Sequence, residues 1–180
     1  MTAALLPPRR PLRRAALSAC LAALAGAPLP AQQPDLTLIS CPVSAERRLE
    51  LSLDPGPTPD KGGFRYAFGP AGSPDLRLFA PFSAGPVRPW NGVGRSIWSS
   101  VTFANGAYSY EVWHSLDRLA PEPRPQAGVN VLKGETLLAA HACLDAPSTR
   151  IAPVFAFEDA MQDAGQAYDR QTGRWRPLAD

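Results

Sequence analysis

The segment Trp90-Asn91-Gly92-Val93-Gly94-Arg95 combines residue types that are suited to molecular recognition. An indole offers a large flat apolar surface, and a guanidinium offers a planar fork of donors that matches a carboxylate. No Gly-Lys-Ser/Thr sequence and no predicted helix follows, so the segment does not have the features of a phosphate-binding loop. We predict a ligand-binding loop. In the structural alternative, the glycines form a bulge and Trp90 covers one end of the core.

Two further tryptophans would extend such a surface if they point outward. Trp98 shares its strand face with Ser96 and Ser100, because side chains on a strand alternate between its two faces. We expect at least one of Trp98 and Trp113 to be exposed or half-covered. The predicted ligand-binding residues are Trp90, Asn91, Arg95, Trp98 and Trp113.

The chain offers few residues for catalysis or metal binding. It has two histidines, His114 and His141, and neither lies in an HExxH or His-x-His pattern. His114 and Ser115 are neighbours on one predicted strand and face opposite ways, and no G-x-S-x-G motif is present. We predict no catalytic residue, no metal site and no cofactor.

The first 31 residues have the three zones of a secretion signal. A basic start with Arg9, Arg10, Arg13 and Arg14 precedes an Ala/Leu run over 15–27, which is shorter than the roughly 20 apolar residues of a membrane span. Cleavage is expected after Ala31, and the protein is then periplasmic or secreted. Two alternatives stay open: a lipobox-like sequence at 17–20 that would lipidate Cys20, and a twin-arginine signal.

Cleavage of the signal changes the charge of the protein. The whole chain has 18 basic and 16 acidic side chains, and the signal removes four basic residues and no acidic ones. The remaining 149 residues therefore carry a small net negative charge. This balance does not favour nucleic acid or an anionic membrane as a partner. No later segment is apolar enough to span a membrane, so no transmembrane segment is expected in the mature chain. The predicted partner is a protein or a cell-envelope ligand.

Two cysteines, Cys41 and Cys143, remain after cleavage. Thiols in an exported protein meet an oxidising compartment, where two of them usually pair. We therefore predict a structural disulfide between them. Closing a loop of about 100 residues stabilises the folded state by roughly 4–5 kcal/mol in the chain-entropy model.

Alternation of apolar and polar residues predicts strands through most of the remaining chain. The predicted strands cover 36–41, 49–53, 64–68, 76–78, 95–104, 107–116, 129–132 and 136–143. Asn105-Gly106 predicts a hairpin with a type I′ turn, in which both central residues need positive φ. The pattern indicates a mainly β fold: a small antiparallel sandwich or barrel of seven to eight strands.

The pattern changes after Cys143. Phe157, Met161 and Tyr168 recur at helical spacing, and Glu158 and Asp159 lie where acidic groups favour a helix start. We predict a short amphipathic helix over 156–169. The expected organisation is a signal peptide over 1–31, a disulfide-braced β domain over 32–144 and a C-terminal tail with the helix over 145–180.

The order of motifs resembles a group of small exported bacterial proteins without an established activity. The resemblance covers about residues 40–144 and rests on Phe64-Arg-Tyr-Ala-Phe-Gly69, Pro74-Asp-Leu-Arg-Leu78, Trp90–Arg95, Val101–Tyr110, Ser115–Arg118, Gly128–Val131 and Cys143. It implies the same domain limits and the same cysteine pairing. In size, export and disulfide-braced β architecture, the chain is also similar to periplasmic lysozyme inhibitors, although their inhibitory loop motif is not found here.

These features are compatible with three functions. The first is a non-catalytic periplasmic binding or inhibitor-like module that uses the Trp90–Arg95 segment. The second is a cell-envelope hydrolase that uses His114 or His141 with a carboxylate. The third is a structural envelope component that makes its contacts through the C-terminal tail.

Overall fold

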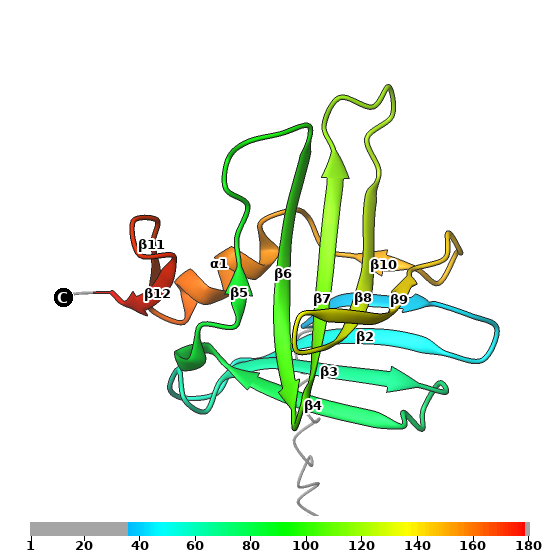
Figure 1. Cartoon of the computed structure of the whole chain (residues 1–180), viewed down its shortest axis with the longest axis horizontal. Helices are drawn as coiled ribbons and strands as arrows, with labels where there is room; N and C mark the ends of the chain where they lie inside the picture. Colours follow the sequence, from blue (N-terminus) through cyan, green and yellow to red (C-terminus); the bar gives the residue numbers. More distant parts are fainter. Residues whose placement is uncertain (1–35, 179–180) are drawn as a thin grey trace, which may run out of the picture. The chain divides into compact units, whose positions relative to one another are not determined.

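Two five-stranded antiparallel sheets form most of the computed structural model, which describes residues 36–178 (Figure 1). The first sheet has, in spatial order, β10 (Arg150–Ile151), β1 (Thr37–Pro42), β2 (Arg48–Asp54), β3 (Gly63–Gly69) and β4 (Leu76–Pro81). The second has β5 (Val87–Arg88), β6 (Ser96–Asn105), β7 (Tyr108–Asp117), β8 (Pro125–Lys133) and β9 (Thr136–Ala142). The predicted mainly β fold class is confirmed. The predicted signal segment and Cys20 lie outside the described residues.

The eight predicted strands correspond to β1–β4 and β6–β9, and the other strands have two to four residues. The remaining elements are the 3-10 helix η1 (Phe82–Ala84), helix α1 (Ala156–Asp163) and the hairpin of β11 (Gln166–Asp169) and β12 (Arg174–Pro177). No helix in the range 36–178 has the length and hydropathy to cross a bilayer.

The core lies between the two sheets, whose strands cross at a steep angle (Figure 1). Leu49 and Leu51 of β2 are fully buried, whereas the intervening Glu50 is exposed. In the second sheet, Val101 of β6 pairs with Val112 of β7, and both side chains are fully buried in the core. Each such aliphatic side chain contributes roughly 1.5–3 kcal/mol through its burial.

The β6–β7 hairpin is present, but its turn differs from the predicted one. Asn105 pairs with Tyr108, so the two central residues are Gly106 and Ala107. Gly106 has φ +60°, and no residue among 36–178 other than glycine has positive φ except Phe155. Positive φ at the first central residue alone is typical of a type II′ turn. The type I′ prediction was wrong because a type I′ turn centred on Asn105-Gly106 needs positive φ at both residues, and Asn105 does not have it.

The predicted disulfide joins Cys41 of β1 to Cys143, with the two Cα atoms 5.5 Å apart. It lies just after β9, where the backbone N–H of Leu144 donates to the carbonyl of Pro42 over 2.8 Å. The bond therefore connects the end of one sheet to the end of the other.

The segment after the disulfide packs against both sheets. β10 extends the first sheet through the pairing of Ile151 with Ile39, and Phe157 and Met161 of α1 lie fully buried in the shared core. The predicted helix over 156–169 is correct at its start but too long. Gly165 has φ +75° and ends the helix, so Tyr168 lies on strand β11 instead.

Candidate functional site

A groove of about 700 Å³ lies between α1, the loop over 89–92 and the β11–β12 hairpin. We call it the α1 groove. Its lining side chains include aromatic and polar ones: Trp90, Tyr168, Trp175, Glu158, Asp159, Gln162 and Arg170. Two of its three walls come from the C-terminal segment.

The loop that carries Trp90 is held by its own hydrogen bonds. The indole Nε1 of Trp90 donates to the carbonyl of Val93 over 2.9 Å, and the N–H of Val93 donates to Oδ1 of Asn91 over 3.0 Å. Gly92 has φ +87°, which L side chains rarely adopt. The Asn-Gly sequence thus builds a tight turn that presents Trp90 to the groove.

The opposite wall is an aromatic pair on the β11–β12 hairpin. Tyr168 and Trp175 are cross-strand partners with ring centroids 5.2 Å apart. The indole Nε1 of Trp175 donates to the carbonyl of Val87 over 2.7 Å, so the hairpin is anchored to edge strand β5. The sequence did not reveal this wall. Tyr168 was assigned to the predicted helix over 156–169, and Trp175 lies in a segment for which no element was predicted.

Glu158 is a buried acid at the base of the groove, with a relative exposure of 8%. Burial raises the pKa of its carboxyl, and this effect is partly offset by its own backbone N–H, the Ser99 hydroxyl and the N–H of Trp90. Its Oε2 atom has no hydrogen-bond partner among residues 36–178. The same carboxyl therefore contacts both the Trp90 loop and the core.

Behind Glu158, the core contains a serine–histidine pair. Oγ of Ser99 lies 2.5 Å from Nε2 of His114, and the His114 ring stacks on Phe157 with a centroid distance of 4.0 Å. Burial lowers the pKa of His114 to about 4, so the ring is neutral at pH 7. Both side chains are 1% exposed, which keeps substrates from reaching them.

This cluster does not have the connectivity of a catalytic triad. In a triad the acid accepts a hydrogen bond from His Nδ1. Here Nδ1 of His114 has no partner within the described chain, and Glu158 is next to Ser99 instead. The geometry describes a buried polar cluster that supports the groove, and not a nucleophile open to solvent.

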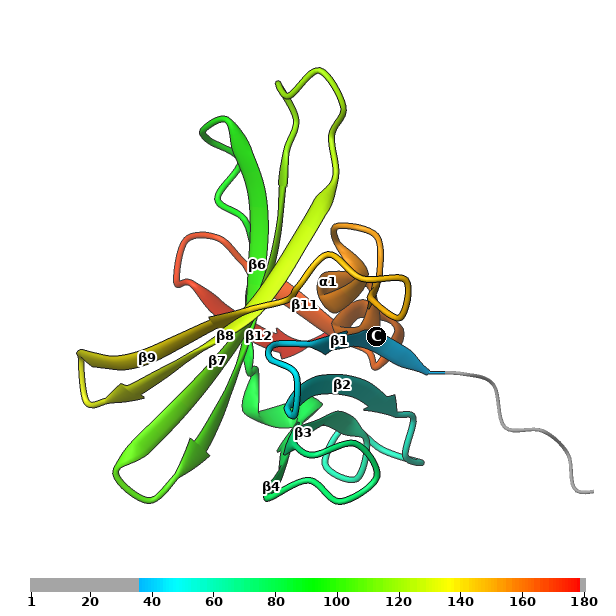
Figure 2. The ribbon, with the colours of Figure 1, turned by 90° about the vertical axis from the view of Figure 1, so that its right-hand side faces the viewer.

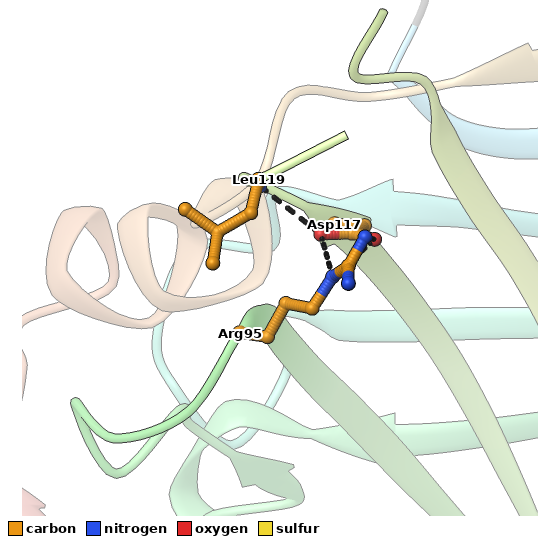
Figure 3. Close-up of polar contacts among 3 residues, drawn as sticks. All are labelled: Arg95, Asp117 and Leu119. Atoms are coloured by element: carbon orange, nitrogen blue, oxygen red, sulfur yellow. Dashed lines mark hydrogen bonds and ion pairs between the residues drawn. The ribbon is translucent and has the colours of Figure 1, made fainter. Parts of the chain in front are cut away.

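Arg95 lies outside the α1 groove, in an ion pair with Asp117 (Figure 3). Its Nε lies 2.7 Å from both carboxylate oxygens, and the N–H of Leu119 also donates to Asp117 over 3.0 Å. The ion pair lowers the pKa of Asp117. The donor fork predicted to bind a ligand carboxylate thus binds a carboxylate of the same chain and ties the start of β6 to the end of β7.

The other predicted residues fall into two groups. Trp90, Asn91 and Trp98 line a small pocket of about 290 Å³ that adjoins the α1 groove through Tyr168 and Arg170. The guanidinium groups of Arg118 and Arg88 cover the rings of Trp90 and Trp98, at 5.3 and 5.2 Å. The structure therefore brings these three residues together.

Trp113 of β7 lies elsewhere and pairs with Gly128 of the neighbouring strand β8. A Cβ atom on Gly128 would come within 2.7 Å of the Trp113 ring, so the glycine makes room for it. Trp113 lines a separate groove of about 800 Å³ near the disulfide, together with residues of 124–127 and 142–152. That groove is larger, but it lacks the three aromatic side chains and the buried acid of the α1 groove.

Within residues 36–178, no three His, Cys, Asp or Glu side chains are grouped so that they would hold a metal ion. No protein-family model, no curated protein and no solved structure matches the chain.

Proposed function

We propose that this protein is an exported, non-catalytic binding module that takes an uncharged, hydroxyl-rich ligand of the cell envelope, such as a glycan strand, in the α1 groove. The observation that carries the proposal is the combination of aromatic faces with free polar side chains in that single groove. Export follows from the signal-like residues 1–31, and the disulfide is compatible with it.

The aromatic side chains suit the apolar face of a sugar ring. A pyranose has C–H groups on its faces and hydroxyl groups at its edge, so it stacks on flat aromatic rings while its edge stays polar. Trp90 on one side and the Tyr168–Trp175 pair on the other provide such rings. Trp90 and Trp175 are held in place by hydrogen bonds from their indole nitrogens, so little side-chain entropy is lost on binding.

The polar side chains suit the hydroxyl edge of a sugar. Asp159 and Gln162 are exposed on α1, and their side chains make no hydrogen bond within residues 36–178. Carboxylate, amide and guanidinium groups offer paired donors or acceptors that match neighbouring hydroxyls. The groove contains Arg170 as well as the acidic side chains, and this mixture of charges favours an uncharged ligand over an anion or a cation.

The proposal is tested by replacing Trp90 with alanine and measuring binding to chitooligosaccharides by calorimetry and to purified peptidoglycan by co-sedimentation. We expect Trp90→Ala to weaken both by at least tenfold, because the groove loses one aromatic wall while the fold is kept. Val93→Ala is the matched control, since Val93 belongs to the same loop, is 72% exposed and does not line the groove.

Equal binding by wild type and Trp90→Ala would contradict the proposal. So would wild-type protein that binds neither probe. Unchanged thermal unfolding of Trp90→Ala shows that the loss of binding comes from the groove and not from unfolding.

A further inference from the structure

The edge strand β9 is unprotected, in contrast to the other strand edges. The two five-stranded sheets end, among the described residues, in β10, β4, β5 and β9. Strand edges carry unpaired backbone groups, and proteins usually block them with charges, prolines, short length or a covering element. A long edge without these features is a surface for pairing with another strand.

The first three edges are each blocked. β10 and β5 have two residues each, and β5 also accepts a hydrogen bond from Trp175 of the β11–β12 hairpin. β4 carries Arg77 near its start and Pro81 at its end, and the guanidinium of Arg65 lies 5.3 Å from the ring of its exposed Phe79. These edges offer little for a further strand.

β9 differs in each of these respects. Its seven residues, Thr-Leu-Leu-Ala-Ala-His-Ala, include no charged side chain and no proline. Leu137 and Leu138 are 56% and 53% exposed, although large aliphatic side chains are usually buried. The β8–β9 hairpin projects from the rest of the chain at its tip, so a second strand has room to approach (Figure 2).

We propose that β9 is a homodimer interface, in which β9 pairs in antiparallel register with β9 of a second copy and joins two five-stranded sheets into one. A two-fold axis lets each copy cover the edge of the other, so neither open edge remains. Small residues at the middle of the strand, Ala139 and Ala140, leave no steric conflict between side chains that face each other across the new strand pair.

Charge favours a second copy of the chain over a charged partner. From residue 32 onward the chain carries 14 basic and 16 acidic side chains, so two copies repel each other only weakly. The strand itself offers no charge that would select a basic or acidic protein. The interface is small, so we expect a dissociation constant on the order of micromolar.

The proposal is tested by sedimentation equilibrium of the protein beginning at residue 32, from low to several hundred micromolar. We expect a reversible dimer whose dissociation constant rises by at least tenfold in Leu138→Lys, because a lysine on the edge must be desolvated on pairing. Phe79→Lys is the matched control on the β4 edge and is expected to dimerise like wild type. Ala140→Lys serves as a second variant if Leu138→Lys unfolds.

Hydrogen exchange locates the interface independently. Backbone amides within 136–142 are expected to become more protected as protein concentration rises, whereas those of β4 stay unchanged. A monomer at every concentration overturns the proposal. A dimer that persists in both Leu138→Lys and Ala140→Lys overturns it as well. So does a wild-type dimer in which the amides of β9 gain no protection.

Discussion

His114 and Glu158 are buried titratable residues whose effects on stability have opposite pH dependence. The pKa of His114 is lowered from 6.5 to about 4, so the folded state excludes a proton that the unfolded state binds. Its contribution to stability is present above pH 6.5 and is lost as the pH falls toward 4. The pKa of Glu158 is raised by burial, so its contribution is present at low pH and is lost as the pH rises through the folded pKa.

For His114 we expect the free energy of unfolding to fall by up to about 3 kcal/mol between pH 7 and pH 4, because one pKa unit corresponds to about 1.4 kcal/mol. Urea unfolding across this range measures the change, and NMR of the imidazole protons assigns it to the residue. Titration of His114 near pH 6.5 in the folded protein would contradict the prediction. His114→Gln is expected to be less stable but to lack this part of the pH dependence.

For Glu158 we expect Glu158→Gln to raise the melting temperature at pH 8 and to have a smaller effect near pH 4. The amide keeps polar contacts but cannot ionise, so the desolvation cost of a buried charge disappears. Scanning calorimetry at several pH values checks this. The control is Asp163→Asn on the exposed side of the same helix, whose effect is expected to change little over that range. An equal effect of Glu158→Gln at all pH values would argue against a raised pKa.

At the level of elements, the β6–β7 turn decides which side chains meet across the sheet. A type I′ turn centred on Asn105-Gly106 would pair Ala104 with Ala107. The observed turn instead pairs Asn105 with Tyr108. When the centre of the turn moves by one residue along the chain, each residue of β6 pairs with a residue of β7 two positions further on. Ser99 therefore faces His114, whereas the predicted turn would have placed it opposite Val112. The buried polar cluster behind the groove depends on this register.

We expect Gly106→Ala to destabilise the protein by about 1–2 kcal/mol, because an L residue at φ +60° is strained. A Cβ at this position would meet nothing within 4 Å, so the cost is conformational and not steric. Asn105→Ala should be nearly neutral, since Asn105 has ordinary backbone geometry. Chemical denaturation measures both variants, and a larger loss in Asn105→Ala would favour the type I′ turn.

At the level of the whole molecule, the disulfide connects two sheets that otherwise meet mainly through side chains. Cys41 is fully buried, and 102 residues of sequence separate it from Cys143. A bond that closes so long a loop restricts the unfolded chain strongly. The C-terminal segment adds to this closure, because β10 and α1 pack on the same core.

We expect the double variant Cys41→Ala/Cys143→Ala to lose about 4–5 kcal/mol of unfolding free energy in the chain-entropy model. Urea unfolding of the variant, compared with oxidised wild type, measures the loss. Wild type with both thiols shown to be free provides the second comparison, since reduction removes the bond but keeps the sulfur atoms. Equal stability of oxidised and reduced protein would contradict the expectation.

The sequence by itself determined the fold class, eight of the strands, the cysteine pair and the start of α1. These features depend on local patterns: period-two alternation for the strands, acidic residues at a helix start, and two remaining thiols. Trp90 was also marked as a candidate ligand-binding residue, because an indole, two glycines and an arginine lie in one short segment.

Only the tertiary structure decided how the candidate site is composed. Arg95 and Asp117 are 22 residues apart and meet because β6 and β7 pair. Trp90 and Trp175 line one groove because the hairpin after α1 folds back onto β5. Such contacts depend on strand register and on packing between distant segments, which composition and periodicity do not specify. For the same reason, Trp113 carries a residue type suited to recognition but lies in a different groove.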